Sequence, residues 1–451
     1  MVALGVTRGA PVGAQLSGAF SPSSVVREDG RLASLSTYLA IAAFAMAMLP
    51  RLLTAVGAPA LVNFLHFPVT VGAVLLVAPR MRSRMAMAFL RAFYLLFFVA
   101  VASAFLNGAG LINAVLSFLL LVEPFLLLLL LTHRGLRRDQ YDLFRRVVLL
   151  IASLHIAMAY YQYFVLGLTD DHVKGVFLAQ GAGHHVAGAV ALTTSAYLLT
   201  STVPRSSFLR IAAAVVCALV VFFSDAKQVT LVFLASLFPL AFRRARIGAV
   251  ARRVGMAGLV CLAFLGAAQA FLPKLVHGAG WGSLDAVLTG LRHKYSVFLL
   301  LESKSPSPLH LLAGLGPGHT CGRLAHLIPD YVAQLEPLGV TKSSVTAEVI
   351  RLRESNHLSS SRTGSSLWSP SFFWSGVFGD LGLAGLAGVA ILWGLGWRYH
   401  AADPLARYLA LNVLLFGLVY SWPEEPGYMM FVAALLGLRW QQRHLDQATA
   451  R

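Results

Sequence analysis

The chain has 451 residues, of which 57% are hydrophobic and only 12% are charged. Because a soluble domain carries about 25% charged residues, this composition excludes a water-soluble fold and indicates a helical membrane protein. The net charge of +17 does not indicate a nucleic acid partner, since basic residues also collect in the cytoplasmic loops of membrane proteins. The three cysteines, Cys217, Cys261 and Cys321, have neither the number nor the spacing of a disulfide framework or a metal site.

Residues 1–30 are rich in Gly, Ala, Ser and Pro and precede the first apolar run. We therefore expect a flexible cytoplasmic tail at 1–30 and no cleavable signal peptide. Beyond it we expect an all-α polytopic membrane protein with about twelve transmembrane helices, about nine within 31–272 and about three within 371–440, before a cytoplasmic tail at 441–451. The predicted spans are 33–54, 58–79, 86–106, 110–132, 147–167, 185–203, 208–224, 227–242, 253–272, 371–397, 405–421 and 426–440.

Arginine-rich loops predict the orientation. Segments 79–84, 133–146 and 242–253 contain three, five and five arginines, and they follow the second, fourth and eighth predicted spans, so all lie on one side. Alternate loops such as "NGAG" (107–110) and "WPEEPG" (422–427) carry no Arg or Lys. The positive-inside rule then places both termini in the cytoplasm.

One segment interrupts the series of spans. Residues 273–370 contain only short apolar pieces, at 295–301 and 308–316, which are too short to cross a bilayer. The segment falls between the ninth and tenth spans, on the side opposite the arginines. We expect a large outer loop domain here, and a long loop on a rigid scaffold commonly carries function.

The run "VVFFSDAKQVTLVF" (220–233) places a polar tetrad between two apolar stretches. The whole apolar run, 208–242, is too long for one span, so we expect a break at the tetrad. In one interpretation Asp225 caps the second helix and Lys227 reaches water from a hairpin tip. In the other, Lys227 faces an outward cavity and binds an anion, because charged groups at membrane depth often mark a substrate path.

Three basic residues, Arg292, His293 and Lys294, precede the first apolar piece of the large loop. In one interpretation they form a basic collar at the membrane interface. In the other, Arg292 clamps a phosphate, with Lys294 as a further substrate contact, since a planar guanidinium matches phosphate oxygens in pairs.

Histidines supply the candidates for a general base. His184 and His185 stand at the outer mouth of the sixth span, and His319 and His357 lie in the large loop. Because adjacent histidines point in different directions, the first pair does not predict a metal site, and we treat both members as candidate substrate contacts.

Two loop segments remain as candidate binding elements. The Gly-rich stretch at 313–320 lacks the strand and helix of a nucleotide-binding loop, but Gly316 and Gly318 allow the backbone to approach a sugar or phosphate closely. The Asp170–Asp171 pair has no third acidic partner nearby, and Lys174 follows it. We therefore expect no metal and no cofactor, with Lys174 as a candidate substrate contact.

Four segments resemble a known family in their order and spacing. "DHVKGVFLAQGAGHHVAGAVAL" (171–192) leads into a glycine-bearing span, and "SDAKQVTLVFLASL" (224–237) resembles a Ser-x-x-Arg/Lys segment that starts a helix. Residues 291–319 have an Arg-led helix followed by a Gly-x-Gly-x-Gly turn, and 369–388 resemble the span after the loop. Over residues 85–440 the chain resembles the O-antigen polymerase and ligase superfamily.

The resemblance implies a metal-independent glycosyltransferase of the bacterial inner membrane that acts at its outer face. Its donor would be a glycan on a polyprenyl pyrophosphate. Its acceptor would be a second lipid-linked repeat unit in a polymerase, or a lipid A core sugar in a ligase. Lys227 and Arg292 match the basic positions that would hold the pyrophosphate, although the first is commonly arginine. His357, in "SNHLSS", is the candidate for the ligase histidine, and its poorly matching context favours a polymerase.

The partners implied are the lipid-linked glycan, membrane lipid, and proteins that regulate chain length or export the product. Two other classes stay open. A transporter of polysaccharide or lipid-linked sugar would show inverted repeats and would not need the large outer loop, and an assembly protein would carry no chemistry.

Overall fold

The computed structural model describes residues 30–178, 183–201, 206–242, 284–359 and 368–449. Throughout these ranges the regular structure is helical, and they contain no β-strand. The expected all-α membrane fold is therefore confirmed at this level, while the number of crossings remains a prediction. Five helical stretches within the ranges are long and apolar enough to cross a membrane: Ala60–Arg80, Arg84–Leu106, Leu111–Thr132, Arg138–Val165 and Phe373–His400.

A helix lies at every predicted span except 253–272, which lies outside the described residues. Up to residue 242 the helices are α1 (Gly30–Met48), α2 (Pro50–Ala55), the 3₁₀ helix η3 (Ala60–Phe64), α3 (His66–Val77), the 3₁₀ helix η4 (Ala78–Arg80), α4 (Arg84–Leu106), α5 (Leu111–Thr132), α6 (Arg138–Tyr160), the π-helix η5 (Tyr161–Val165), the 3₁₀ helix η6 (Asp170–His172), α7 (Gly183–Thr200), α8 (Ser207–Phe223) and α9 (Lys227–Phe242).

The segment 284–359 is also helical, so the expected loop domain has regular structure. In the described residues from 284 onward the helices are α12 (Leu284–Ser303), α13 (Pro308–Ala313), α14 (Arg323–Asp330), α15 (Val332–Leu335), the 3₁₀ helix η7 (Glu336–Leu338), α16 (Ser344–Ser359), α17 (Phe373–His400), α18 (Pro404–Val419), the 3₁₀ helix η9 (Trp422–Glu424) and α19 (Pro426–Thr449).

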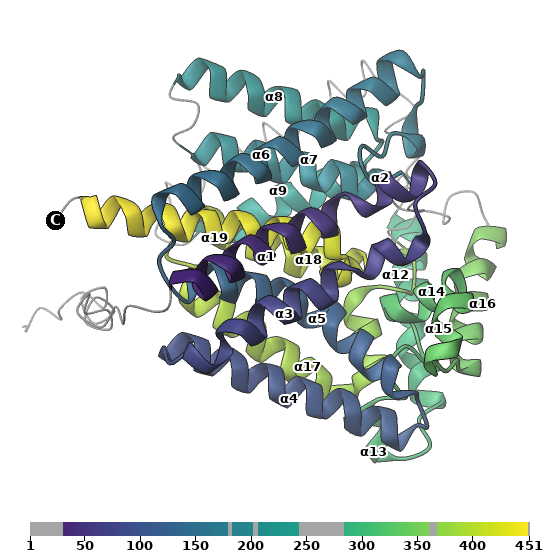
Figure 1. The fold of residues 1–451 in the computed structure, drawn as a ribbon. Coiled ribbons are helices and arrows are strands. Elements are labelled where there is room, and N and C mark those ends of the chain that lie inside the picture. Colours follow the sequence, from purple (N-terminus) through teal and green to yellow (C-terminus); the bar gives the residue numbers. More distant parts are fainter. Residues whose placement is uncertain (1–29, 179–182, 202–205, 243–283, 360–367, 450–451) are drawn as a thin grey trace, which may run out of the picture.

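The long helices form one bundle with two distinct ends (Figure 1). Helices α14, α15 and α16 gather at one end, at the right of the figure, and the C-terminus lies at the other. Asn107, between α4 and α5, donates to the Gly314 carbonyl oxygen at 3.0 Å and so ties this segment to the bundle. We call this the loop end. The opposite end includes Asp403, whose carboxylate pairs with Arg439 at 3.1 Å.

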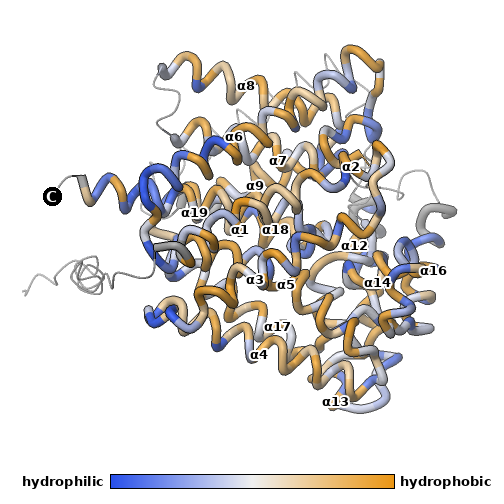
Figure 2. The backbone as a smooth tube through the Cα atoms, in the orientation of Figure 1, coloured by the Kyte–Doolittle hydropathy of each residue, from blue (hydrophilic) through white to orange (hydrophobic). Residues whose placement is uncertain are grey.

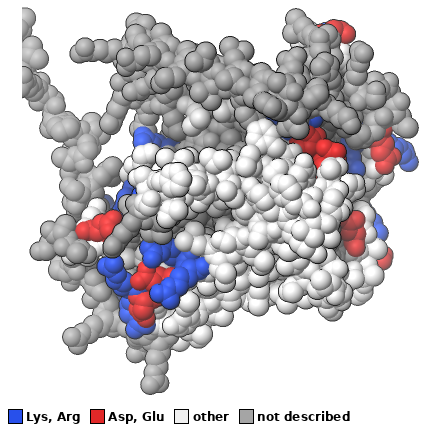
Figure 3. Space-filling view, turned by 90° about the horizontal axis from the view of Figure 1, so that it is seen from above, with Lys and Arg blue, Asp and Glu red and all other residues white. Residues whose placement is uncertain are grey.

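Hydropathy follows this two-ended arrangement. Figure 2 shows apolar middle parts of the long helices between polar ends. Seen from above, charged side chains gather toward the two ends of the face, with an uncharged band between them (Figure 3). Such a band is what a bilayer requires of the surface that faces its hydrocarbon core.

Helix α5 is the central helix of the bundle. Of its most apolar window, 83% is buried, and a helix that is apolar all round belongs inside the protein. Two of its polar residues, Asn113 and Glu123, are 0% and 1% exposed. They therefore have to find partners inside the protein, and both partners lie toward the loop end.

Candidate functional site

The polar tetrad forms a tight connection between α8 and α9, and Lys227 is the first residue of α9. Lys227 Nζ lies 3.0 Å from Asp225 Oδ1, and the Lys227 side chain is 21% exposed. A Cβ atom at Gly188 of α7 would lie 2.7 Å from the Ala226 Cβ. The connection is thus packed against α7, and Lys227 is half-buried and paired instead of standing in free water.

Other charged groups surround this pair. Asp171 Oδ1 lies 3.2 Å from His184 Nε2 at the start of α7. Burial raises the pKa of Asp225, Lys227 lowers it, and Asp170 and Asp171 raise it again. The Lys174 stem packs against Gly183, which precedes His184. We call Lys174, Asp171, His184, Asp225 and Lys227 the tip cluster, and it unites three predicted site residues.

His185 does not point away from His184 as expected, because its ring centroid lies 3.8 Å from that of His184. Its ring centroid lies 5.1 Å from that of Tyr420 and 6.1 Å from that of Trp422. The Tyr420 and Trp422 rings stack on each other at 4.2 Å. His185 therefore connects the tip cluster to the segment between α18 and α19.

The glycine-rich segment 313–322, called the glycine loop below, wraps a carboxylate of the protein itself. Gly316 and Gly318 have φ angles of 108° and 69°, which disfavour other residues. The Gly318 N–H donates to Asp380 Oδ2 at 2.8 Å, and the Thr320 hydroxyl donates to Oδ1 at 2.5 Å. The loop amide at Gly318 thus binds Asp380 of α17.

A hydrogen bond from α5 and a contact of His319 hold the glycine loop in place. Asn113 Nδ2 donates to the Pro317 carbonyl oxygen at 3.0 Å. His319 Nε2 lies 2.8 Å from Thr341 Oγ1, and burial lowers the pKa of His319. His319 therefore has a structural partner in this arrangement.

Lys294 and Arg292 lie on different faces of α12. Lys294 is 3% exposed and donates to the carbonyl oxygens of Ser369 at 3.1 Å and Val419 at 3.3 Å. Burial lowers its pKa to about 7. Arg292 is exposed. His357 belongs to α16, but its side chain lies outside the described residues.

A buried ionic network joins α14, which follows the glycine loop, to the segment after α18. Arg323 pairs through Nη2 with Glu425 Oε2, and Arg51 Nη2 lies 3.6 Å from Glu425 Oε1. The Arg323 backbone N–H donates to Glu424 Oε2 at 3.1 Å. Burial raises the pKa of Glu424 to about 8.

Sequence reasoning did not select this network. In the sequence, the glutamates of "WPEEPG" indicate only the orientation of the chain, and no pattern marks Arg51 or Arg323 as site residues. The available signal was that Glu424 and Glu425 lie between two apolar spans without a basic residue near them in sequence. Such carboxylates need a partner from elsewhere in the fold.

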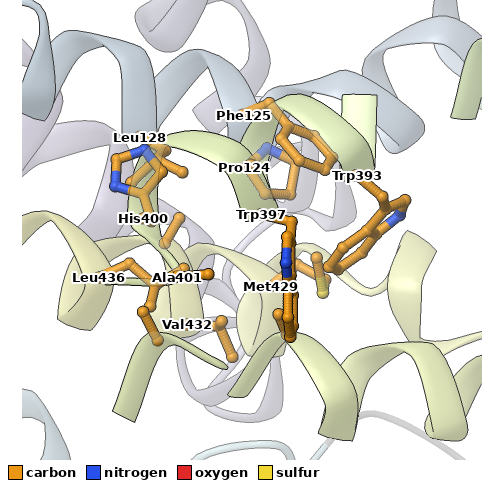
Figure 4. Close-up of a pocket in the computed structure, with 14 residues that line it drawn as sticks. Pro124, Phe125, Leu128, Trp393, Trp397, His400, Ala401, Met429, Val432 and Leu436 are labelled. Atoms are coloured by element: carbon orange, nitrogen blue, oxygen red, sulfur yellow. The ribbon is translucent and has the colours of Figure 1, made fainter. Parts of the chain in front are cut away.

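A separate apolar cavity lies toward the opposite end, between α5, α17, α18 and α19 (Figure 4). Trp393, Trp397 and Met429 point into it. His400 is its one ionisable lining residue, and in the described part of the chain neither ring nitrogen has a hydrogen-bond partner. The predicted site residues do not line this cavity.

The tip cluster, the His185 aromatic contacts, the ionic network and the glycine loop form a continuous series of contacts at the loop end. Across the described ranges, no three His, Cys, Asp or Glu residues are grouped in a way that could hold a metal ion. The chemistry that this series offers is binding of anions by buried cations and proton transfer by carboxyl or imidazole groups. No protein-family profile matches the chain, and no curated protein matches it.

Proposed function

We propose that the chain is a polymerase of polyprenyl-pyrophosphate-linked oligosaccharide repeat units for a surface or secreted polysaccharide. It would be a metal-independent glycosyltransferase of the bacterial inner membrane, with about twelve spans, both termini in the cytoplasm and the loop end at the outer face. The observation that carries the proposal is the concentration of half-buried and buried ionisable side chains at one end of an apolar bundle. This is where a lipid-linked, anionic substrate would meet the protein.

The tip cluster suits the leaving group. When the glycosidic bond to the donor phosphate breaks, the electron pair stays on the pyrophosphate, and a nearby cation stabilises this charge. Lys227 is placed for that role if the anion replaces Asp225 as its partner. Arg292, exposed on α12, would be the second phosphate contact, and its planar fork suits paired oxygens.

The transfer itself asks little more of the protein than positioning. A pyrophosphate-linked sugar is already activated, so holding donor and acceptor hydroxyl in line supplies much of the rate. His184 and Lys174 would contact the donor beside Lys227. The other predicted site residues would hold the contact residues in position, because each already has partners inside the protein. They are Lys294, His185, His319, Gly316 and Gly318.

The discriminating experiment is deletion of the gene followed by analysis of lipid-linked intermediates and export. A polymerase predicts that single repeat units accumulate on the lipid and that long glycan disappears. Accumulation of long lipid-linked chains would indicate a ligase instead. Unchanged intermediates would contradict glycosyl transfer and return the transporter to first place.

A further inference from the structure

A second cavity lies at the loop end, between α2, η3, α3, α5 and α14. Unlike the cavity of Figure 4, it has several polar and charged residues in its lining. Asn63 at its wall donates to the Tyr331 hydroxyl at 3.0 Å. The polar lining residues are Arg51, Asn63, His66, Arg323, Tyr331 and Glu425.

The two arginines of this cavity have more donors than their partner can use. Arg323 is 9% exposed, and the Arg51 side chain is 14% exposed. Both reach the single carboxylate of Glu425. Within the described ranges, the buried Arg323 Nε atom has no hydrogen-bond partner. Two guanidinium groups offer more N–H donors than one carboxylate accepts, so the pair suits a larger anion.

An oriented histidine adds a third group. His66, 3% exposed, has Nδ1 at 2.8 Å from both carboxylate oxygens of Glu123, and Thr70 donates to Glu123 at 2.9 Å. The carboxylate fixes the proton on Nδ1. His66 lines the cavity, and with Nδ1 held by Glu123, Nε2 is the ring nitrogen left for a ligand.

The proposed reaction needs two diphosphate sites, because donor and acceptor are both linked to a lipid diphosphate. The tip cluster and Arg292 provide one. We propose that the cavity between Arg51 and Arg323 is the other, and that it binds the diphosphate of the acceptor unit. This inference rests on the proposed function and extends it to the second substrate.

Entry requires an exchange of anions. The cavity now has room for a molecule about the size of water, and the Glu425 carboxylate occupies both guanidinium groups. A diphosphate would therefore displace Glu425 from Arg51 and Arg323 as it binds. Glu425 thus acts as an internal competitor, and its removal should strengthen binding, an effect opposite to that of removing either arginine.

The test is binding of farnesyl diphosphate to the purified full-length chain in detergent, measured by calorimetry in a Lys227→Ala, Arg292→Ala background that removes both cations of the donor site. Arg51→Gln should weaken binding roughly tenfold or more, the loss expected for a charge-assisted contact. Glu425→Gln should strengthen it. Arg351→Gln, an exposed arginine on α16, is the matched control and should not change it.

Arg323 is deeply buried, so Arg323→Gln is not used as a test because it can fail to fold. The Arg51→Gln and Arg51→Lys variants are compared instead. Unchanged affinity in Arg51→Gln, or weaker binding in Glu425→Gln, would overturn the proposal. Inorganic pyrophosphate and phosphatidylglycerol vesicles are the other two probes. If the vesicles compete as well as farnesyl diphosphate, the site takes a phospholipid headgroup, which also overturns it.

The binding result and the deletion experiment fail separately. If Arg51→Gln binds normally and the deletion strain accumulates single repeat units, the cavity site is wrong and the polymerase stands. If Arg51→Gln loses binding and the deletion strain keeps its glycan length, the lipid-diphosphate site stands and the polymerase is wrong.

Discussion

Charged residues at the loop end are paired with one another inside the protein. Lys227 pairs with Asp225, and Arg323 pairs with Glu425. A buried ion pair contributes little net stability, because the desolvation of both ions offsets their attraction. Function is then the better reason for such pairs, and each pair offers a cation that an anionic ligand can take over.

Lys227 is the residue on which the leaving-group role depends. Lys227→Ala should reduce the rate of glycan elongation roughly tenfold or more, because it removes a charge-assisted phosphate contact. The matched control is Lys304→Ala, since Lys304 is also in an ion pair, with Glu348 at 2.7 Å. Glycan length is measured on gels, with membrane expression checked in parallel. Equal elongation in both variants would contradict the role.

Glu424 predicts a pH dependence of stability. Its pKa rises from 4.5 to about 8 on folding because of burial, so the folded state holds a proton that the unfolded state releases. The contribution of Glu424 to the free energy of unfolding is complete below pH 4.5 and is lost as pH rises through 8. The melting temperature in detergent should therefore fall between pH 5 and 8, and Glu424→Gln should flatten this fall. An equal fall in both proteins would refute the assignment.

At the scale of elements, the glycine loop is attached to the bundle mainly through α17 and α5. Asp380 accepts the Gly318 and Thr320 N–H groups, and Asn113 binds the carbonyl of Pro317. When Asn replaces Asp380, the side-chain NH₂ group stands where an acceptor oxygen stood and faces a backbone N–H donor. One hydrogen bond is then lost and two donors meet.

Asp380→Asn should therefore destabilise the protein by roughly 1–3 kcal/mol, the cost of an unsatisfied buried group. It should also speed proteolytic cleavage within 308–341. Asp403→Asn, which alters a carboxylate at the opposite end, is the control and should leave that cleavage unchanged. If both variants are cleaved at the same rate, the anchoring role of Asp380 fails.

The positions of the helices could be predicted from the sequence, because apolar runs of bilayer length and breaks at polar tetrads are local features. The side-chain arrangement could not. Arg292 and Lys294 are two residues apart and equally basic, yet only the contacts of Lys294 with Ser369, ahead of α17, and with Val419, at the end of α18, decide which one is buried. Likewise, Asp380 and Glu425 receive their partners from the glycine loop and α14, which are distant in sequence.

At the scale of the whole molecule, the bundle has an arginine-rich end and a loop end. The predicted topology places the loop end at the outer face of the membrane. In a chain whose three cysteines are replaced by alanine, Glu336→Cys should react with a membrane-impermeant maleimide in intact cells. Arg138→Cys, exposed at the other end, should react only after permeabilisation. The reverse pattern would invert the topology and with it the site.

Reconstitution tests the proposed activity most directly. The purified chain in liposomes would receive lipid-diphosphate-linked repeat units, and both glycan length and released lipid diphosphate would be measured. A polymerase should lengthen the glycan and release one lipid diphosphate per added unit, with EDTA having no effect. Substrate that remains as single units in the presence of a folded chain would contradict the polymerase.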